Sequence, residues 1–194
     1  MTVAILKYNA GNTTSVAFAL ARLGADAICT DNIVELRRAD KVIIPGVGAA
    51  RPAMQYLEER ELDQIVKNLT QPVLGICLGL QILCSSSEED EVDCLGVFET
   101  TCERFRTPRK IPHMGWNLLT DLSGPLFSEI DPLSAYVYFV HSYRAPVCAD
   151  AAALCAHGEQ FSAALQKENF YAVQFHPEKS GEVGHQVLKN FLSI

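Results

Sequence analysis

The chain has 194 residues, of which 48% are hydrophobic and 20% are charged, so we expect one globular domain over residues 1–194. Its formal net charge of -7 argues against a broad surface for nucleic acid or for an anionic membrane. No apolar run approaches the roughly 20 residues of a membrane-spanning helix, and the N-terminus leads into strand-like sequence without a charged leader. We therefore expect a cytoplasmic protein that acts on a small molecule or with a protein partner.

Strand-like and helical segments alternate through the first 76 residues. The predicted strands cover residues 3–6, 27–29, 42–44 and 73–76, and helices are expected from Asn12 or Thr13 to Gly24, after residue 29, and from Pro52 towards Leu69. This alternation predicts an α/β fold with a doubly wound, mostly parallel sheet flanked by helices, of the flavodoxin-like kind. Ligands of such sheets bind beyond the carboxyl ends of the strands.

The pattern changes after residue 95. Short strand-like runs at residues 97–98, 136–140, 163–165 and 171–175 are separated by loops, which predicts an antiparallel extension of the sheet. Residues 182–192 place their apolar side chains on one helical face and predict a closing helix.

Cys77 stands in the segment GICLG (75–79), where a strand turns sharply into a helix. This is the nucleophile-elbow pattern with cysteine in place of serine, and Gly75 and Gly79 relieve the crowding where strand and helix approach. At a helix N-terminus the sulfur experiences oriented N–H groups that favour the thiolate. The other six cysteines form no C-x-x-C pair and show no zinc-type spacing, so we interpret them as reduced, buried side chains without a metal.

A cysteine nucleophile needs a base, and the base needs an orienting group. The segment QFHPE (174–178) supplies both, because His176 follows a predicted strand and Glu178 stands two residues later. Of the other histidines, only His157 has a carboxylate within two residues, and its His-Gly-Glu sequence favours a surface loop.

A glycine-rich turn, PGVG (45–48), follows another predicted strand and can present backbone N–H groups to an oxyanion. It completes neither the phosphate-loop nor the dinucleotide motif. We therefore expect no nucleotide and no other cofactor.

Together, PGVG, GICLGLQ (75–81) and QFHPE resemble the class I, triad-type glutamine amidotransferases. The resemblance implies that Cys77 attacks the side-chain amide of glutamine, that His176 is base and then acid, and that Glu178 orients it. It also implies an oxyanion hole and a set of glutamine-binding residues. The oxyanion hole would be formed at Leu78, Val47 and Gly48, and glutamine would be held by Gln81, Glu99, His141 and Ser142.

Within that class, the segments PHMGWN (112–117), YFVHSY (138–143), HPEKS (176–180) and YNAGN (8–12) resemble the glutaminase subunits of imidazole glycerol phosphate synthase. The resemblance implies a heterodimer with a cyclase subunit, a β/α-barrel that receives ammonia through a closed passage. The products would be imidazole glycerol phosphate and an aminoimidazole carboxamide ribotide, in histidine biosynthesis. The residues implied at the interface and ammonia exit are Asn12, Trp116, Tyr138 and Lys179.

Three points stay open at the level of sequence. Trp116 and Met114 suit the core and an interface equally, and the acidic run at residues 88–91 is interpreted as a solvated loop. The partner synthase could instead belong to aminobenzoate, guanylate or pyridoxal phosphate synthesis. The chain could also be a catalytically silent flavodoxin-like binding or regulatory module in which Cys77 only packs.

Overall fold

The computed structural model describes residues 1–9 and 11–194, so Ala10 in the YNAGN segment lies outside the described residues. The main sheet comprises β1 (Thr2–Leu6), β2 (Asp26–Thr30), β3 (Lys41–Ile44), β4 (Val73–Ile76), β11 (Ala151–Ala156), β12 (Gln160–Lys167) and β13 (Phe170–Val173). The smaller sheets comprise β5 (Cys84–Ser87), β6 (Val92–Asp93), β7 (Phe98–Arg104) and β10 (Tyr143–Arg144), and the pair β8 (His113–Leu118) and β9 (Tyr136–His141). The helices are α1 (Thr13–Arg22), α2 (Ile33–Arg38), α3 (Ala50–Glu59), α4 (Leu62–Lys67), α5 (Leu78–Leu83) and α6 (Gly181–Ser193), with short 3-10 turns η1 (Glu89–Glu91), η2 (Pro125–Phe127) and η3 (Pro177–Lys179).

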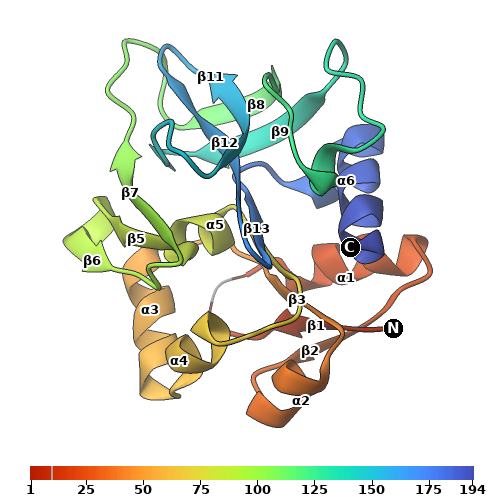
Figure 1. Ribbon diagram of the computed structural model, residues 1–194. Helices are drawn as coiled ribbons and strands as arrows, with labels where there is room; N and C mark the ends of the chain where they lie inside the picture. Colours follow the sequence, from red (N-terminus) through yellow and green to blue (C-terminus); the bar gives the residue numbers. More distant parts are fainter. Residues whose placement is uncertain (10) are drawn as a thin grey trace.

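The main sheet has the strand order β11-β12-β13-β4-β3-β1-β2. Its strands from β2 to β13 pair in parallel, whereas β12 and β11 add to β13 in antiparallel fashion. The predicted fold class, a mostly parallel sheet with an antiparallel extension, is therefore confirmed. Figure 1 shows β8, β9, β11 and β12 gathered beyond one end of the helical layers.

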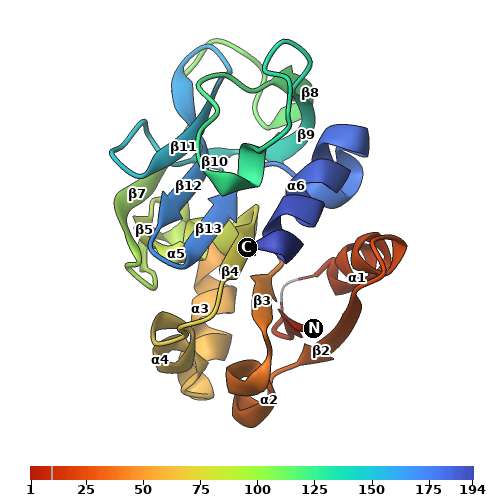
Figure 2. The ribbon, with the colours of Figure 1, turned by 45° about the vertical axis from the view of Figure 1, so that its right-hand side comes forward.

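Helices cover both faces of the parallel strands (Figure 2). Alternate residues of one strand point to opposite faces, so Val3 and Ile5 pack with α1 and α6, while Ala4 and Leu6 pack with α2, α3, α4 and α5. The side chains of these strand residues are almost completely buried. This two-sided burial explains why the strands read as continuous apolar runs in the sequence.

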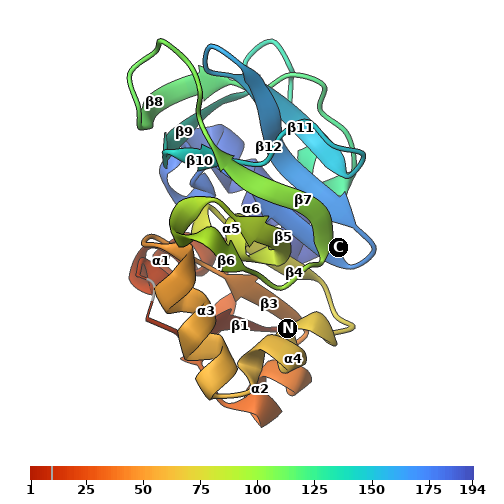
Figure 3. The same ribbon diagram turned by 90° about the vertical axis from the view of Figure 1, so that its left-hand side faces the viewer.

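The predicted helix from Pro52 towards Leu69 is wrong in one respect, because the chain forms two helices, α3 and α4 (Figure 3). Glu61, with φ 55°, breaks the helix between them. On a continuous helix Leu57 and Leu62 would be rotated by about 140° from each other. The break lets both leucines reach the same core cluster.

Five strands were not predicted, namely β5, β6, β8, β10 and β11, and β13 ends at Val173 rather than at Phe175. Gln174 to Lys179 therefore belong to a connection that leaves the sheet beside the ends of β4, β3 and β1. The carboxyl ends of these neighbouring parallel strands meet at one edge. No helix within the described residues is long and apolar enough to span a membrane.

Candidate active site

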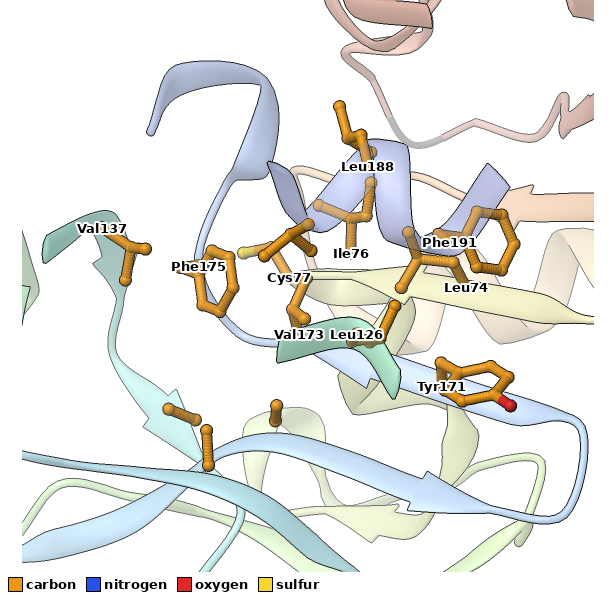
Figure 4. Close-up of a cluster of buried hydrophobic side chains, with 14 of the residues drawn as sticks. Leu74, Ile76, Cys77, Leu126, Val137, Tyr171, Val173, Phe175, Leu188 and Phe191 are labelled. Atoms are coloured by element: carbon orange, nitrogen blue, oxygen red, sulfur yellow. The ribbon is translucent and has the colours of Figure 1, made fainter. Parts of the chain in front are cut away.

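Cys77 occupies a sharp turn between β4 and α5. Its backbone has φ 53° and ψ −103°, which is an unfavourable conformation for a residue with a side chain. The turn is fixed by its neighbours, since the Cys77 N–H donates to the Val173 carbonyl of β13 at 2.8 Å. Figure 4 shows Cys77 at the end of β4, with its sulfur directed toward the side of Phe175.

The two glycines around Cys77 stand where backbones come too close for a side chain. A Cβ atom at Gly79 would lie 2.0 Å from the Ile44 carbonyl oxygen of β3. A Cβ atom at Gly75 would lie 2.7 Å from the carbonyl oxygen of Gly79. The start of α5 is thereby pressed against two strands, which places the elbow directly beside the glycine-rich turn after β3.

His176 and Glu178 form a buried pair on the connection after β13. His176 Nδ1 lies 2.9 Å from Glu178 Oε1, and each side chain is only 1% exposed. The His176 N–H donates to the Tyr138 carbonyl at 3.0 Å, and the Asn12 side-chain amide donates to Glu178 Oε1. The pair is therefore held by β9 and by the loop after β1.

Cys77 and His176 are neighbours although they are 99 positions apart in the sequence. Burial lowers the pKa of His176, but hydrogen bonding and charge from Cys77 and Glu178 outweigh burial and raise that pKa to about 9. Glu178 holds Nδ1 of His176, so the buried Nε2 is the ring nitrogen that can exchange a proton with the sulfur or with a substrate. A thiolate beside an imidazolium is the arrangement that makes a cysteine nucleophilic at neutral pH.

A pocket of about 320 Å³ opens beside the sulfur. It brings together three of the residues expected to bind glutamine (Gln81, His141 and Ser142), the three expected at the oxyanion hole (Val47, Gly48 and Leu78), and Cys77. The remaining lining residues are Glu89, Pro112, Val140 and Tyr143. The volume suits a ligand of the size of one amino acid.

Glu99 does not lie in this pocket, which corrects the expectation that it binds glutamine. Its side chain is 88% exposed on β7 and approaches Lys167 Nζ at 3.4 Å. Glu89 lies in the pocket instead, with Oε2 accepting the Ala50 N–H at 3.1 Å. Burial raises the pKa of Glu89 above its usual value. The acidic run at residues 88–91 was interpreted as a solvated loop. Its composition does not show that the turn η1 directs Glu89 into the pocket.

The residues expected at the interface lie in two places, on the strand pair β8 and β9 and around the turn η3. Trp116 is 57% exposed on β8 and meets Tyr138 of β9 edge to face at 6.2 Å between ring centroids, while Lys179 lies exposed on η3. Met114 is also exposed, so neither it nor Trp116 belongs to the core. Asn12 is half-buried against Glu178.

Two further groups near the sulfur were not predicted. Gln174, which is fully buried, donates from Nε2 to Cys77 Sγ at 3.6 Å. The Tyr8 hydroxyl donates to the Pro45 carbonyl at the start of the glycine-rich turn. Burial and the charge of Cys77 raise the pKa of Tyr8 well above its usual value. Both residues stand inside motifs quoted above, but the contact of Gln174 with the sulfur and the nearness of Tyr8 to it follow only from the fold.

No group of three or more His, Cys, Asp or Glu side chains in residues 1–9 and 11–194 is arranged to hold a metal ion.

Comparison with known proteins agrees with this geometry. The family model "Glutamine amidotransferase class-I" matches residues 5–194. The imidazole glycerol phosphate synthase subunit HisH of Bacteroides fragilis (strain YCH46) is 53% identical over 198 residues, covering 100% of both chains. The subunit HisH of Yersinia pseudotuberculosis is 44% identical over 198 residues, again with 100% of both chains covered.

A solved glutamine amidotransferase from Thermotoga maritima shares the fold with a TM-score of 0.65 at 16% identity, covering 99% of this chain and 80% of that one. With the elbow cysteine, the buried His–Glu pair and the pocket in place, the matches over the whole length define the family. The chain belongs to the class-I glutamine amidotransferases and, within them, to the HisH glutaminase subunits of imidazole glycerol phosphate synthase.

Proposed function

We propose that Cys77, His176 and Glu178 hydrolyse glutamine in the pocket beside the elbow, and that the ammonia passes to a cyclase subunit. The observation that carries this proposal is the meeting of an elbow cysteine with a buried His–Glu pair across one pocket. A cysteine that only packed would need neither a strained backbone nor a raised histidine pKa.

In the first half of the reaction the Cys77 thiolate attacks the side-chain carbonyl carbon of glutamine. The developing oxyanion lies near the backbone N–H of Leu78 and the turn at Val47 and Gly48, which line the same pocket. His176 gives its proton to the amide nitrogen, the C–N bond breaks, and ammonia leaves a thioester on the sulfur.

In the second half a water molecule attacks the thioester. His176, now neutral, accepts the proton of this water, the C–S bond breaks, and glutamate and the thiolate are released. Glu178 fixes the orientation of the ring in both halves, because its carboxylate accepts a hydrogen bond from Nδ1–H. Nε2 is thereby left to give a proton to the amide nitrogen and to accept one from water.

Glu89 supports recognition of glutamine as an amino acid. Among the described residues that line the pocket, Glu89 is the one carboxylate, and it can pair with the α-ammonium group of the substrate. Gln81 and Ser142 line the same pocket and add polar groups to it.

The partner is proposed to be the β/α-barrel cyclase subunit of the same synthase, in a heterodimer. The names of the relatives support it, since each is a subunit of imidazole glycerol phosphate synthase. The exposed face of β8 and β9 supports it too: Met114, Trp116 and Tyr136 are each at least half exposed. Aromatic residues and methionine are enriched at protein interfaces. This face lies beside the triad, since the Tyr138 carbonyl accepts the His176 N–H.

The test combines labelling with reconstitution. A glutamine analogue with an electrophilic side chain should modify Cys77, and the label should be lost in Cys77→Ala. In a mixture with a cyclase subunit, Cys77→Ser should lose glutamine-dependent formation of imidazole glycerol phosphate but keep formation from added ammonium. Loss of both activities would mean that Cys77 is structural, and label on the other cysteines alone would contradict the assignment.

A further inference from the structure

Gln174 and Gln81 connect the nucleophile to the carbonyl oxygen of Tyr143. Gln81 Nε2 lies 3.2 Å from Tyr143 O and 3.4 Å from Gln174 Oε1, and Gln174 Nε2 lies 3.6 Å from Cys77 Sγ. Gln81 is 5% exposed and Gln174 is fully buried. Both amides are therefore held inside the protein.

The Tyr143 carbonyl decides which end of each amide faces which neighbour. A backbone carbonyl only accepts, so the end of Gln81 that faces it must be the NH₂ group. The second hydrogen of this NH₂ group then needs an acceptor, which must be Oε1 of Gln174. Gln174 is left with its NH₂ group toward Cys77, so the sulfur faces a donor.

A second chain of hydrogen bonds, through His141 and His113, ends at the same Tyr143 carbonyl. His141 Nδ1 lies 2.7 Å from Tyr143 O and must carry a proton, so His141 Nε2 accepts from His113 Nδ1 at 3.1 Å. His113 Nε2 then accepts from the Asn117 side-chain amide at 3.2 Å. Burial lowers the pKa of His113 to about 4 and that of His141 to about 3. Both rings are thus neutral near pH 7, and each has a single donating nitrogen.

We propose that Gln174 is a further catalytic residue, whose side-chain amide donates to the Cys77 thiolate and which Gln81 and the Tyr143 carbonyl hold in the donating orientation. This inference rests on the proposed function of Cys77 as the nucleophile. His176 also interacts with the sulfur, from the same connection, and Tyr8, from the loop after β1, is close enough for the charge of Cys77 to affect its pKa. Of these three groups, Gln174 cannot change its protonation state during turnover.

That difference gives Gln174 a separate role. His176 is neutral after it has given its proton to the amide nitrogen of glutamine and becomes charged again when it accepts a proton from water, so its interaction with the sulfur changes within each turnover. The sulfur must leave as a thiolate when water attacks. A fixed amide donor stabilises the leaving sulfur at this point, because a hydrogen bond to a charged group is stronger than one to a neutral group.

The test measures alkylation of Cys77 by iodoacetamide across pH, with peptide mass spectrometry to separate it from the other cysteines. Gln174→Met removes the donor at similar volume, and Gln174→Glu replaces it with an acceptor. We expect the pH midpoint of alkylation to rise by about one unit in Gln174→Met, and by more in Gln174→Glu. Gln71→Met is the matched control, since Gln71 donates to the Leu36 carbonyl away from the site, and it should keep the wild-type midpoint.

An unchanged midpoint in a folded Gln174 variant would overturn the proposal. If neither variant folds, side-chain amide resonances of Gln174 in the ¹⁵N-labelled wild type decide it: they should shift as Cys77 ionises and stay fixed in Cys77→Ala. Resonances that move equally in both proteins would also overturn it. Failure of the proposed function is distinguishable, because the wild type itself would then not use glutamine with the cyclase.

Discussion

His176 Nδ1 lies 2.9 Å from Glu178 Oε1, with both side chains only 1% exposed, although the two residues are separated by a single proline. The contact fixes the tautomer of the ring, because the proton on Nδ1 points at the carboxylate. It also holds a negative charge beside the imidazolium in a region that water does not reach. The orienting group is therefore built into the same short segment as the base.

Replacing Glu178 by Gln should lower kcat for glutamine hydrolysis by about 10³-fold, because the amide can stabilise the wrong tautomer and carries no charge. The measurement is glutamate release by the complex with the cyclase. Glu182→Gln is the matched control, since Glu182 is exposed on α6. Ammonium-dependent synthesis should be unchanged in both variants, and a full loss of it in Glu178→Gln would point to misfolding instead.

The raised pKa of His176 predicts how stability changes on the alkaline side. Its pKa is about 9 in the folded chain against the ordinary histidine value of 6.5, so the folded state binds more protons than the unfolded state between these values. This contribution is complete below about pH 6.5 and is lost as pH rises through about 9. We expect the free energy of unfolding by urea to fall by roughly 2–3 kcal/mol over that window.

The comparison that isolates this effect uses two histidine variants. His176→Asn should flatten the dependence of unfolding free energy on pH, whereas His185→Asn, at an exposed position of α6, should leave the slope as it is. An equal slope in wild type and His176→Asn would show that another group titrates.

His113 and His141 predict the opposite trend on the acid side. Burial lowers their pKa values to about 4 and about 3, so the unfolded chain binds more protons than the folded chain below about pH 6.5. The contribution of these two histidines to the free energy of unfolding is complete above that pH and is lost as the pH falls towards 3–4. His157, expected in a surface loop, is half-buried and stacks on His113 at 4.3 Å between ring centroids. Urea unfolding at pH 6.5 and 4.5 should show a smaller difference in His113→Gln than in wild type.

Glu89 and Glu99 offer a paired test of the pocket. Glu89→Gln should raise KM for glutamine by about 10-fold or more, because the α-ammonium group loses its carboxylate partner. Glu99→Gln should leave KM unchanged, since Glu99 is exposed on β7 and contacts Lys167. Steady-state glutaminase kinetics in the complex measure both values. A rise in KM for Glu99→Gln alone would restore the original expectation.

The sequence predicted the parallel core and the catalytic segments because both depend on local patterns. Strand β4 was predicted with its observed bounds, because a short apolar run between Pro72 and Cys77 indicates a strand that is buried on both faces. Glu89 was missed because the inward turn of η1 is a tertiary feature that an acidic run does not reveal. The hydrogen bond from Gln174 to Cys77 was missed for the same reason, since it joins residues 97 positions apart.

Gly79 tests whether the close approach of α5 to β3 sets the elbow. In Gly79→Ala the new Cβ would lie 2.0 Å from the Ile44 carbonyl oxygen, so the helix or the strand must move, and we expect a loss of about 2–4 kcal/mol in unfolding free energy. Gly96→Ala is the matched control, because Gly96 has φ +70° but nothing within 4 Å of the added Cβ. Its backbone strain alone should cost about 1 kcal/mol. Equal losses in the two variants would contradict a cost set by the contact with β3, because Gly79, unlike Gly96, does not have a positive φ.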